Sequence, residues 1–169
     1  MDETLRANQA IWDAWTVGEA DSEHARDAAK VRAGGSSLRP IERAELGEVA
    51  GRTLLHLLCN QGADTVSWAR LGAHVTGVDF SAEAITRART LAAETRVHAR
   101  FLACDLYALP AALDEQFDIV YAAYGVLCWL PDLARWAATV ARYVRPGGIC
   151  YLVDMHPCLL YTSPSPRDR

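Results

Sequence analysis

The chain has 169 residues, a length that suits one domain with a sizeable core, and its 51% apolar and 22% charged residues are ordinary for a globular protein. The net charge of −4 comes without a dense basic run, so we expect no nucleic-acid partner. No apolar stretch approaches the ~20 residues of a membrane span, so we expect no membrane partner.

The acidic start of the chain, with no apolar run after it, argues against a signal peptide. The five cysteines are scattered and contain no C-x-x-C pair, which makes zinc and disulfides poor interpretations. Reduced thiols fit best, so we expect a cytoplasmic protein without a metal site.

The first 38 residues predict a helix followed by a polar segment. Residues 3–16 carry Ile11, Trp12 and Trp15 at helical spacing. We favour a helix that caps the core over a lid whose aromatic side chains border a pocket. Residues 17–38 predict a loop with some helix in its first half, which either closes over a ligand or simply connects.

From residue 40 the chain alternates between helical and strand patterns. The predicted strands cover Thr53–Leu58, His74–Val78, Ala99–Cys104, Phe117–Ala123 and Ile149–Val153. The predicted helices cover 40–49, 63–71, 82–95 and 131–144. This alternation predicts an α/β fold with a parallel sheet, helices on both faces and right-handed crossovers.

The turn after the first strand, Cys59-Asn60-Gln61-Gly62, is the expected binding region for a nucleoside-containing ligand. Gly62 would let the backbone come close to a ligand, with the amide groups of the next helix pointing at it. Asp79 and Asp105 follow the second and third strands. Because parallel strands end at one edge of the sheet, these carboxylates are expected beside the turn.

The end of the chain departs from this alternation. Pro146-Gly147-Gly148 predicts a sharp turn, after which Ile149–Val153 would form an exposed apolar edge strand. Residues 159–169 contain two Ser-Pro pairs, which exclude a central strand or helix. They resemble a sequencing-adapter read-through, so we expect a non-native tail and a reading frame lost near Cys158.

Residues 35–156 resemble the class I S-adenosylmethionine-dependent methyltransferases, of the small-molecule, type 11/12/25-like group. That family ends its first strand with acid-x-Gly-x-Gly-x-Gly, whose positions fall here on His56, Leu58, Asn60 and Gly62. Only the last glycine is present. The segment is similar to a branch of the family with a His-Leu-Gln-Cys version of the motif.

The resemblance implies S-adenosylmethionine as the cofactor and a small molecule as the methyl acceptor. Asp79 matches the acid that accepts hydrogen bonds from both ribose hydroxyls, a task suited to the two oxygens of a carboxylate. Phe80 would pack against the adenine, and Asp105 would meet its amino group. The full set of implied cofactor-binding residues is His56, Cys59, Asn60, Gly62, Asp79, Phe80, Asp105, Leu106, Ala122 and Tyr124.

Methyl transfer from a sulfonium displaces an already activated carbon, so the protein mostly supplies proximity and alignment. A general base is optional, and the candidates are His156, His24 and Tyr124. Either histidine is more often an ordinary surface residue. Tyr107, Tyr124 and Trp129 are candidates for an acceptor pocket, although core packing is the safer interpretation for Trp129.

The expected domain organisation has three parts. The expected parts are a lid-like helix and loop over 1–34, a partial methyltransferase domain over 35–158 and the tail over 159–169. The family has seven strands, so the last two would be missing.

Two alternatives stay open. One is a truncated fragment that binds the cofactor without turnover. The other is an NAD-binding Rossmann oxidoreductase, which requires G-x-G-x-x-G after the first strand. Leu58, Asn60 and Ala63 stand where those glycines should fall, so the second alternative fits poorly.

Overall fold

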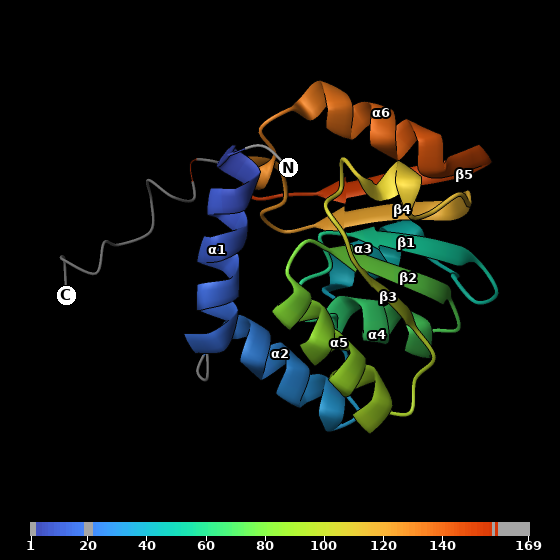
Figure 1. Ribbon diagram of the computed structural model, residues 1–169. Helices are drawn as coiled ribbons and strands as arrows, with labels where there is room; N and C mark the ends of the chain where they lie inside the picture. The colour runs from blue at the N-terminus through green and yellow to red at the C-terminus, as the bar shows by residue number, and fades with distance from the viewer. Residues whose placement is uncertain (1–2, 19–21, 157, 159–169) are drawn as a thin grey trace.

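The computed structural model describes residues 3–18, 22–156 and 158 (Figure 1). The tail expected over 159–169 lies outside the described residues. Within them the sheet consists of β1 (Thr53–Leu57), β2 (His74–Asp79), β3 (Arg100–Ala103), β4 (Phe117–Ala123) and β5 (Val144–Val153). The helices are α1 (Glu3–Gly18), α2 (Glu23–Arg32), α3 (Pro40–Leu46), α4 (Ala63–Arg70), α5 (Ala82–Glu94) and α6 (Leu133–Tyr143).

All neighbouring strands run parallel, in the order β3-β2-β1-β4-β5. The predicted five-stranded parallel sheet is therefore confirmed within the described part of the chain. The chain moves outward from β1 to β3 and then returns to the other side of β1 at β4. Ligands bind at such a reversal, outside the carboxyl ends of the strands.

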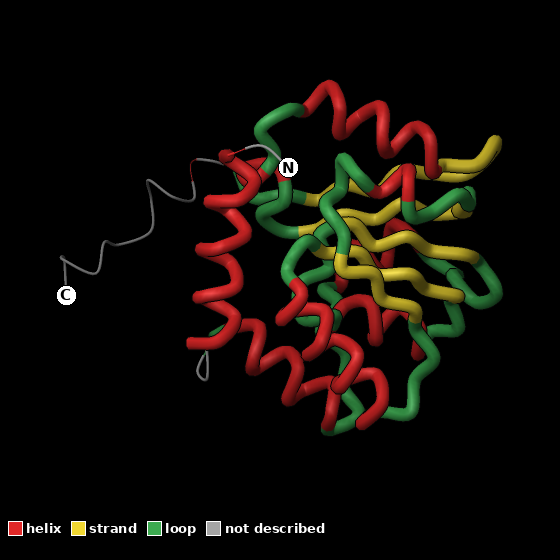
Figure 2. Tube along the Cα trace, in the orientation of Figure 1, coloured by secondary structure: helices red, strands yellow, loops and turns green. Residues whose placement is uncertain are grey.

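Both faces of the sheet are covered by helices, as Figures 1 and 2 show. On β1, Leu55 and Leu57 belong to the same cluster as Tyr143 of α6, whereas Leu54 clusters with Trp68 of α4. All five side chains are at most 1% exposed. Successive strand residues face opposite sides of a sheet, which explains the continuous apolar run of the first strand.

Helix starts follow local sequence signals. The Ser81 hydroxyl accepts a hydrogen bond from the Ala84 amide at 3.1 Å and caps α5. Asp132 caps α6 by accepting from the Arg135 amide at 2.9 Å. Such caps satisfy amide groups that have no partner inside the helix.

The sharp turn predicted at Pro146-Gly147-Gly148 is wrong, because these residues lie within β5. The register against β4 shifts between Phe117 and Ile119, so the three residues form an irregularity in a continuous strand. A Cβ on Gly148 would lie 3.0 Å from the carbonyl oxygen of Phe117. The expected apolar edge is confirmed: β5 is the outer strand, and Ile149 is 39% exposed.

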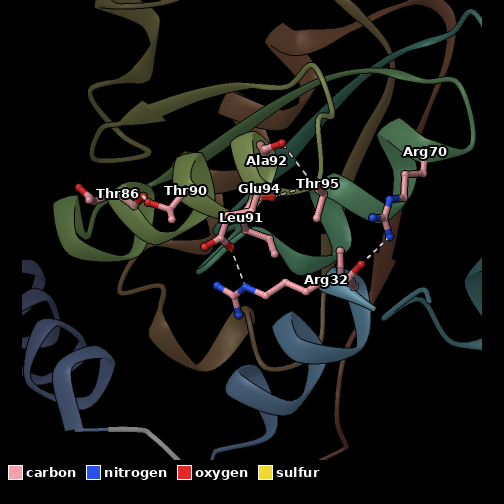
Figure 3. A network of polar contacts seen from close by, with 9 residues as sticks. Arg32, Arg70, Thr86, Thr90, Leu91, Ala92, Glu94 and Thr95 are labelled. Atoms are coloured by element: carbon pink, nitrogen blue, oxygen red, sulfur yellow. Dashed lines mark hydrogen bonds and ion pairs between the residues drawn. The ribbon is translucent and has the colours of Figure 1, made fainter. Parts of the chain in front are cut away.

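The helix expected in the first half of residues 17–38 is confirmed as α2, which is tied to two other helices (Figure 3). Arg32 forms an ion pair with Glu94 of α5 at 2.7 Å. The Arg70 guanidinium donates to the carbonyl oxygens of Val31 at 2.7 Å and Gly35 at 3.0 Å. These bonds favour the connector interpretation of the segment after α2.

No helix in the described part of the chain is long and apolar enough to cross a membrane. The same residues contain no cluster of three or more His, Cys, Asp or Glu side chains that could hold a metal ion.

Candidate active site

A cavity of about 380 Å³ lies at the carboxyl ends of β1 and β4, where the strand order reverses. The β1–α4 turn, the end of β4, α1 and α2 all contribute to its wall. A narrower recess of about 30 Å³ continues between α1 and the ends of β2 and β3. Leu58, Asp79, Phe80 and Trp129 line both spaces, so the two form one continuous site.

Asp79 is a buried, anchored carboxylate at the junction of the two spaces. It is 3% exposed; one oxygen accepts from the Asn60 amide at 2.8 Å and the other from the Ser81 amide at 2.9 Å. Burial raises the pKa of this carboxyl to about 6. Each oxygen has a further lone pair, so the group can accept two more donors, such as a pair of adjacent hydroxyls.

The β1–α4 turn holds two non-glycine residues in the left-handed region. Leu58 has φ +53° and Asn60 has φ +48°, at two positions where the resembled motif has glycine. Asparagine tolerates this region better than leucine does. The conformation presents the Asn60 amide to Asp79 and places both side chains at the cavity wall.

Gly62, the remaining glycine of the motif, has φ +77°. A Cβ here would lie 2.7 Å from the Ala88 Cβ of α5 and 3.1 Å from the Phe101 ring of β3. The space left by the absent side chain is therefore filled by the protein and does not make room for a ligand, contrary to the expectation. The residue still lines the cavity.

His56 stands at the motif's acid position as a buried, neutral imidazole. Its Nδ1 lies 2.8 Å from the Thr65 hydroxyl, and its ring packs edge-on against Tyr121 at 4.8 Å. Burial lowers the pKa of His56 to about 3, so the ring carries no charge at neutral pH. A negative charge at this end of the cavity has to come from another residue.

Asp64, in the first turn of α4, supplies such a charge and was missed by the sequence reasoning. The Ser37 hydroxyl donates to its Oδ1 at 2.5 Å and lies 3.1 Å from the Ser67 hydroxyl. Burial raises the pKa of the Asp64 carboxyl to about 6. The sequence signal that could have identified Asp64 as a site residue is its position two residues after Gly62. Gln61 was missed too; its Nε2 is buried and has no hydrogen-bond partner among the described residues, although the residue lines the cavity.

Helix α1 lies across the site and is bonded to it at three points. Asn8 donates to the Trp129 carbonyl at 3.2 Å, and Gln9 donates to the Phe80 carbonyl at 2.9 Å. The Ser81 hydroxyl donates to Asp13 at 2.5 Å. These bonds hold α1 over the carboxyl ends of the strands.

Of the large apolar side chains of α1, some line the cavity and others lie at the surface. Trp12 lines the cavity and packs edge-on against Trp129 at 5.1 Å and His24 at 6.1 Å. Ile11 and Trp15 are 44% and 50% exposed. The lid interpretation, which we favoured less, therefore describes Trp12 better than the interpretation as a core cap.

Tyr124 is held by a buried acid. Its hydroxyl donates to Glu42 at 2.5 Å, and Glu42 also accepts from the Arg39 amide at 2.7 Å. The Arg39 guanidinium lies 4.2 Å above the Tyr124 ring. Burial, together with Glu42, raises the pKa of Tyr124, so this hydroxyl keeps its proton and serves poorly as a general base.

The structure brings most of the expected site residues together. The large cavity is lined by His56, Cys59, Asn60, Gly62, Asp79, Phe80, Tyr124 and the candidate base His24. Asp105, Leu106 and Tyr107 line the narrow recess.

Two expected site residues lie elsewhere. Ala122 is 2% exposed and packs in the apolar cluster on the α6 side of the sheet. His156 is exposed and is not among the residues that line either space; its Nδ1 accepts from the Cys158 amide at 3.2 Å.

Comparison with known proteins gives a consistent result. The model of the methyltransferase domain family matches residues 55–152. A ubiquinone biosynthesis O-methyltransferase of Aeromonas salmonicida is 32% identical over 106 residues, 63% of this chain and 44% of that protein. An uncharacterized Mycobacterium tuberculosis protein is 32% identical over 147 residues, 87% of this chain and 50% of that protein. The chain spans half or less of the length of these relatives.

Solved structures with the same fold include complexes with nucleoside ligands. DhpI bound to S-adenosylhomocysteine is 28% identical, with a TM-score of 0.64 over 91% of this chain and 71% of that one. A Thiobacillus denitrificans S-adenosylmethionine-dependent methyltransferase, also bound to S-adenosylhomocysteine, is 27% identical. Its TM-score is 0.55, over 68% of this chain and 48% of that one.

Proposed function

The chain belongs to the methyltransferase domain family, and we propose that it transfers a methyl group from S-adenosylmethionine to a small-molecule acceptor. The family match covers β1 to β5 almost entirely, including the strand ends that surround the cavity. Two solved neighbours above 25% identity are complexes with S-adenosylhomocysteine, the product that this reaction leaves.

The observation that carries the proposal is the position of Asp79. Its carboxylate is fixed by two backbone amides, lies between the large cavity and the narrow recess, and keeps acceptor capacity for two hydroxyls. A ribose at Asp79 would direct an attached base toward Asp105 and Leu106, where the recess of about 30 Å³ would have to widen to admit it. The rest of the nucleoside ligand would then extend into the large cavity.

The charge of the cavity favours a cationic ligand over a dinucleotide. Four carboxylates, from Glu23, Asp27, Asp64 and Asp79, line it against one guanidinium, that of Arg39. A pyrophosphate would sit at the start of the helix after the first strand, where Asp64 here places a carboxylate. S-adenosylmethionine carries a sulfonium and an ammonium, which suit this lining. NAD binding is therefore not favoured.

When bound, S-adenosylmethionine would supply a methyl group already activated by the sulfonium charge. The protein's own residues align the reactants and exclude water. Asp79 fixes the nucleoside end, while Trp12 and Trp129 form an apolar wall beneath α1. Alignment of this kind can lower the barrier of such a displacement by roughly 7–11 kcal/mol.

We assign deprotonation of the acceptor, where the acceptor needs it, to His24. This histidine lies in the cavity wall, and imidazole is the side chain that most often serves as a general base. His156 lies outside the wall, and Tyr124 is bonded to Glu42.

Isothermal titration calorimetry with S-adenosylhomocysteine tests the proposal. We expect saturable binding by the wild type and its loss in Asp79→Ala, with Asp114→Ala, an exposed acid that lines neither the cavity nor the recess, as the matched control. A folded wild type that does not bind, or that binds NADH without displacement by S-adenosylhomocysteine, contradicts the proposal. Binding without transfer of a labelled methyl group to any tested acceptor would favour the fragment that binds without turnover.

A further inference from the structure

We propose that α1, where it lies in this structure, blocks the narrow recess to a nucleoside, and that the ligand enters only after α1 has moved away. Two side chains of α1, Gln9 and Asp13, form a latch that opposes binding. This inference rests on the proposed function, because it takes the ligand to be a nucleoside held at Asp79. A lid that closes over a bound ligand would have the opposite effect, since its contacts would strengthen binding.

The recess is too small to hold a nucleoside base as it stands. Its volume is about 30 Å³, which suits about one or two water molecules, and a purine is several times larger. Leu5 and Asn8 of α1 form one wall of the recess, and residues at the ends of β2 and β3 form another. Strand pairing fixes the ends of β2 and β3, so α1 is the wall that can move.

The latch joins α1 to the residues that follow β2. The Gln9 side chain donates to the Phe80 carbonyl at 2.9 Å, and Asp13 accepts from the Ser81 hydroxyl at 2.5 Å. Leu5, Gln9 and Asp13 are spaced four residues apart, so one face of α1 carries both the blocking side chain and the latch. Gln9 and Asp13 line neither the recess nor the large cavity, so the latch does not itself form the ligand site.

Helix α1 can move without opening the core. None of its described residues belongs to the apolar clusters that join the sheet to its other helices, and Figure 1 shows α1 across the end of the sheet. Beyond the latch, Asn8 donates to the Trp129 carbonyl at 3.2 Å, and the Trp12 ring packs against that of Trp129. A segment held mainly by a few polar contacts opens at a lower free energy than the whole domain.

Labelling of Cys104 with N-ethylmaleimide measures the opening of α1 without any ligand. This thiol is half-buried and lines the recess that α1 covers, whereas Cys59 lies in an apolar core cluster and reports general unfolding. Peptide mass spectrometry gives the labelling rate at each cysteine. We expect Gln9→Ala/Asp13→Ala to raise the rate at Cys104 by roughly tenfold or more, because two hydrogen bonds that favour the closed position are lost. The rate at Cys59 should not change.

Ile11→Ala is the matched control for labelling, because Ile11 is an exposed residue of the same helix and lines neither space. It should leave the rate at Cys104 within about twofold of the wild type. An unchanged rate in the double variant, or an equal increase at Cys59, contradicts the latch.

Calorimetry with adenosine tests whether α1 opposes binding. A ligand that binds only the open form has an apparent affinity reduced by the fraction of open protein. The double variant should therefore bind adenosine roughly tenfold more tightly than the wild type. Asp13→Asn, which removes the charge near Asp79 and keeps an acceptor oxygen for Ser81, should change the affinity less.

The outcomes separate this inference from the proposed function. Equal or weaker binding of adenosine by the double variant, or an equal gain from Asp13→Asn alone, overturns the inference, while binding of S-adenosylhomocysteine by the wild type still supports the function. If neither the folded wild type nor the folded double variant binds S-adenosylhomocysteine, the proposed function fails, and the labelling rates still show whether the latch exists.

Discussion

The Asp79 carboxylate accepts a hydrogen bond from the Asn60 amide at 2.8 Å, and this bond joins the end of β2 to the turn after β1. The turn reaches this position because Leu58 and Asn60 both adopt positive φ angles. The geometry of the proposed nucleoside site therefore depends on backbone strain in the turn as well as on the acid itself.

Replacing Asn60 by valine should destabilise the protein by about 1–2 kcal/mol, because a β-branched residue fits poorly at φ +48°. The Asn60 amide would also move away from Asp79 and weaken S-adenosylhomocysteine binding. Asn60→Gly is the control and should change the free energy of unfolding by less than about 0.5 kcal/mol. Urea unfolding and calorimetry measure the two effects. Equal stability of both variants would contradict the strained turn.

Gly62→Ala should be more destabilising than an alanine at another left-handed glycine. At Gly62 the new Cβ would meet Ala88 at 2.7 Å, whereas at Gly51, with φ +75°, nothing lies within 4 Å of it. We expect about 1–2 kcal/mol from the backbone at Gly51 and about 1–3 kcal/mol more at Gly62 from the steric clash. Chemical denaturation of both variants gives the difference, and similar values would show that α5 yields at little cost.

The stability of the ligand-free protein should fall as pH rises from about 4 to about 7. The folded-state pKa values of Asp64 and Asp79 are raised to about 6 from an ordinary value near 3.8, so the folded state binds protons more tightly than the unfolded state in that range. Stability from these groups is therefore present at low pH and is lost as pH rises through 6. Calorimetric scans of the wild type and of Asp64→Asn/Asp79→Asn measure this effect.

The double variant should have a flatter profile of melting temperature against pH between these limits. The comparison rests on the slope of the profile and not on the absolute melting temperature, because Asp79→Asn also loses one of the two amide hydrogen bonds that the carboxylate accepts. An unchanged slope would mean that other groups set the pH dependence.

Because hydrogen bonds hold α1 over the site, the loss of one of them should make the amide hydrogens of α1 exchange faster with solvent. Gln9→Ala removes the bond to the Phe80 carbonyl, so amides of α1 should exchange faster, by roughly tenfold for a loss of about 1.4 kcal/mol. Ile11→Ala, an exposed position on the same helix, should have a smaller effect. Faster exchange in α4 or α5 as well would indicate general destabilisation instead of local release of α1.

Local signals were sufficient for much of the fold. Adjacent residues determine the apolar run of β1 and the helix caps at Ser81 and Asp132, so the order of strands and helices could be predicted from them. The conformation of residues 146–148 could not be predicted in this way. A bulged strand and a turn share the same Pro-Gly-Gly sequence, and only pairing with β4 distinguishes them.

The site was predictable only in part. Asp79 and Asp105 follow strands, so topology alone places them at the cavity. The hydrogen bond that Asp64 accepts comes from Ser37, 27 residues earlier in the chain. The position of α1 over the site depends on contacts such as that of Asn8 with Trp129, which are 121 residues apart. Neither relationship has a signature in sequence spacing.

The acidic lining of the cavity also bears on product inhibition. In the proposed reaction the donor loses its sulfonium charge when the methyl group leaves, so the spent nucleoside carries one positive charge less. Carboxylates such as Asp79 attract the spent form less strongly than the charged donor. The same electrostatics that recruit the donor would therefore help the enzyme to exchange it after each turnover.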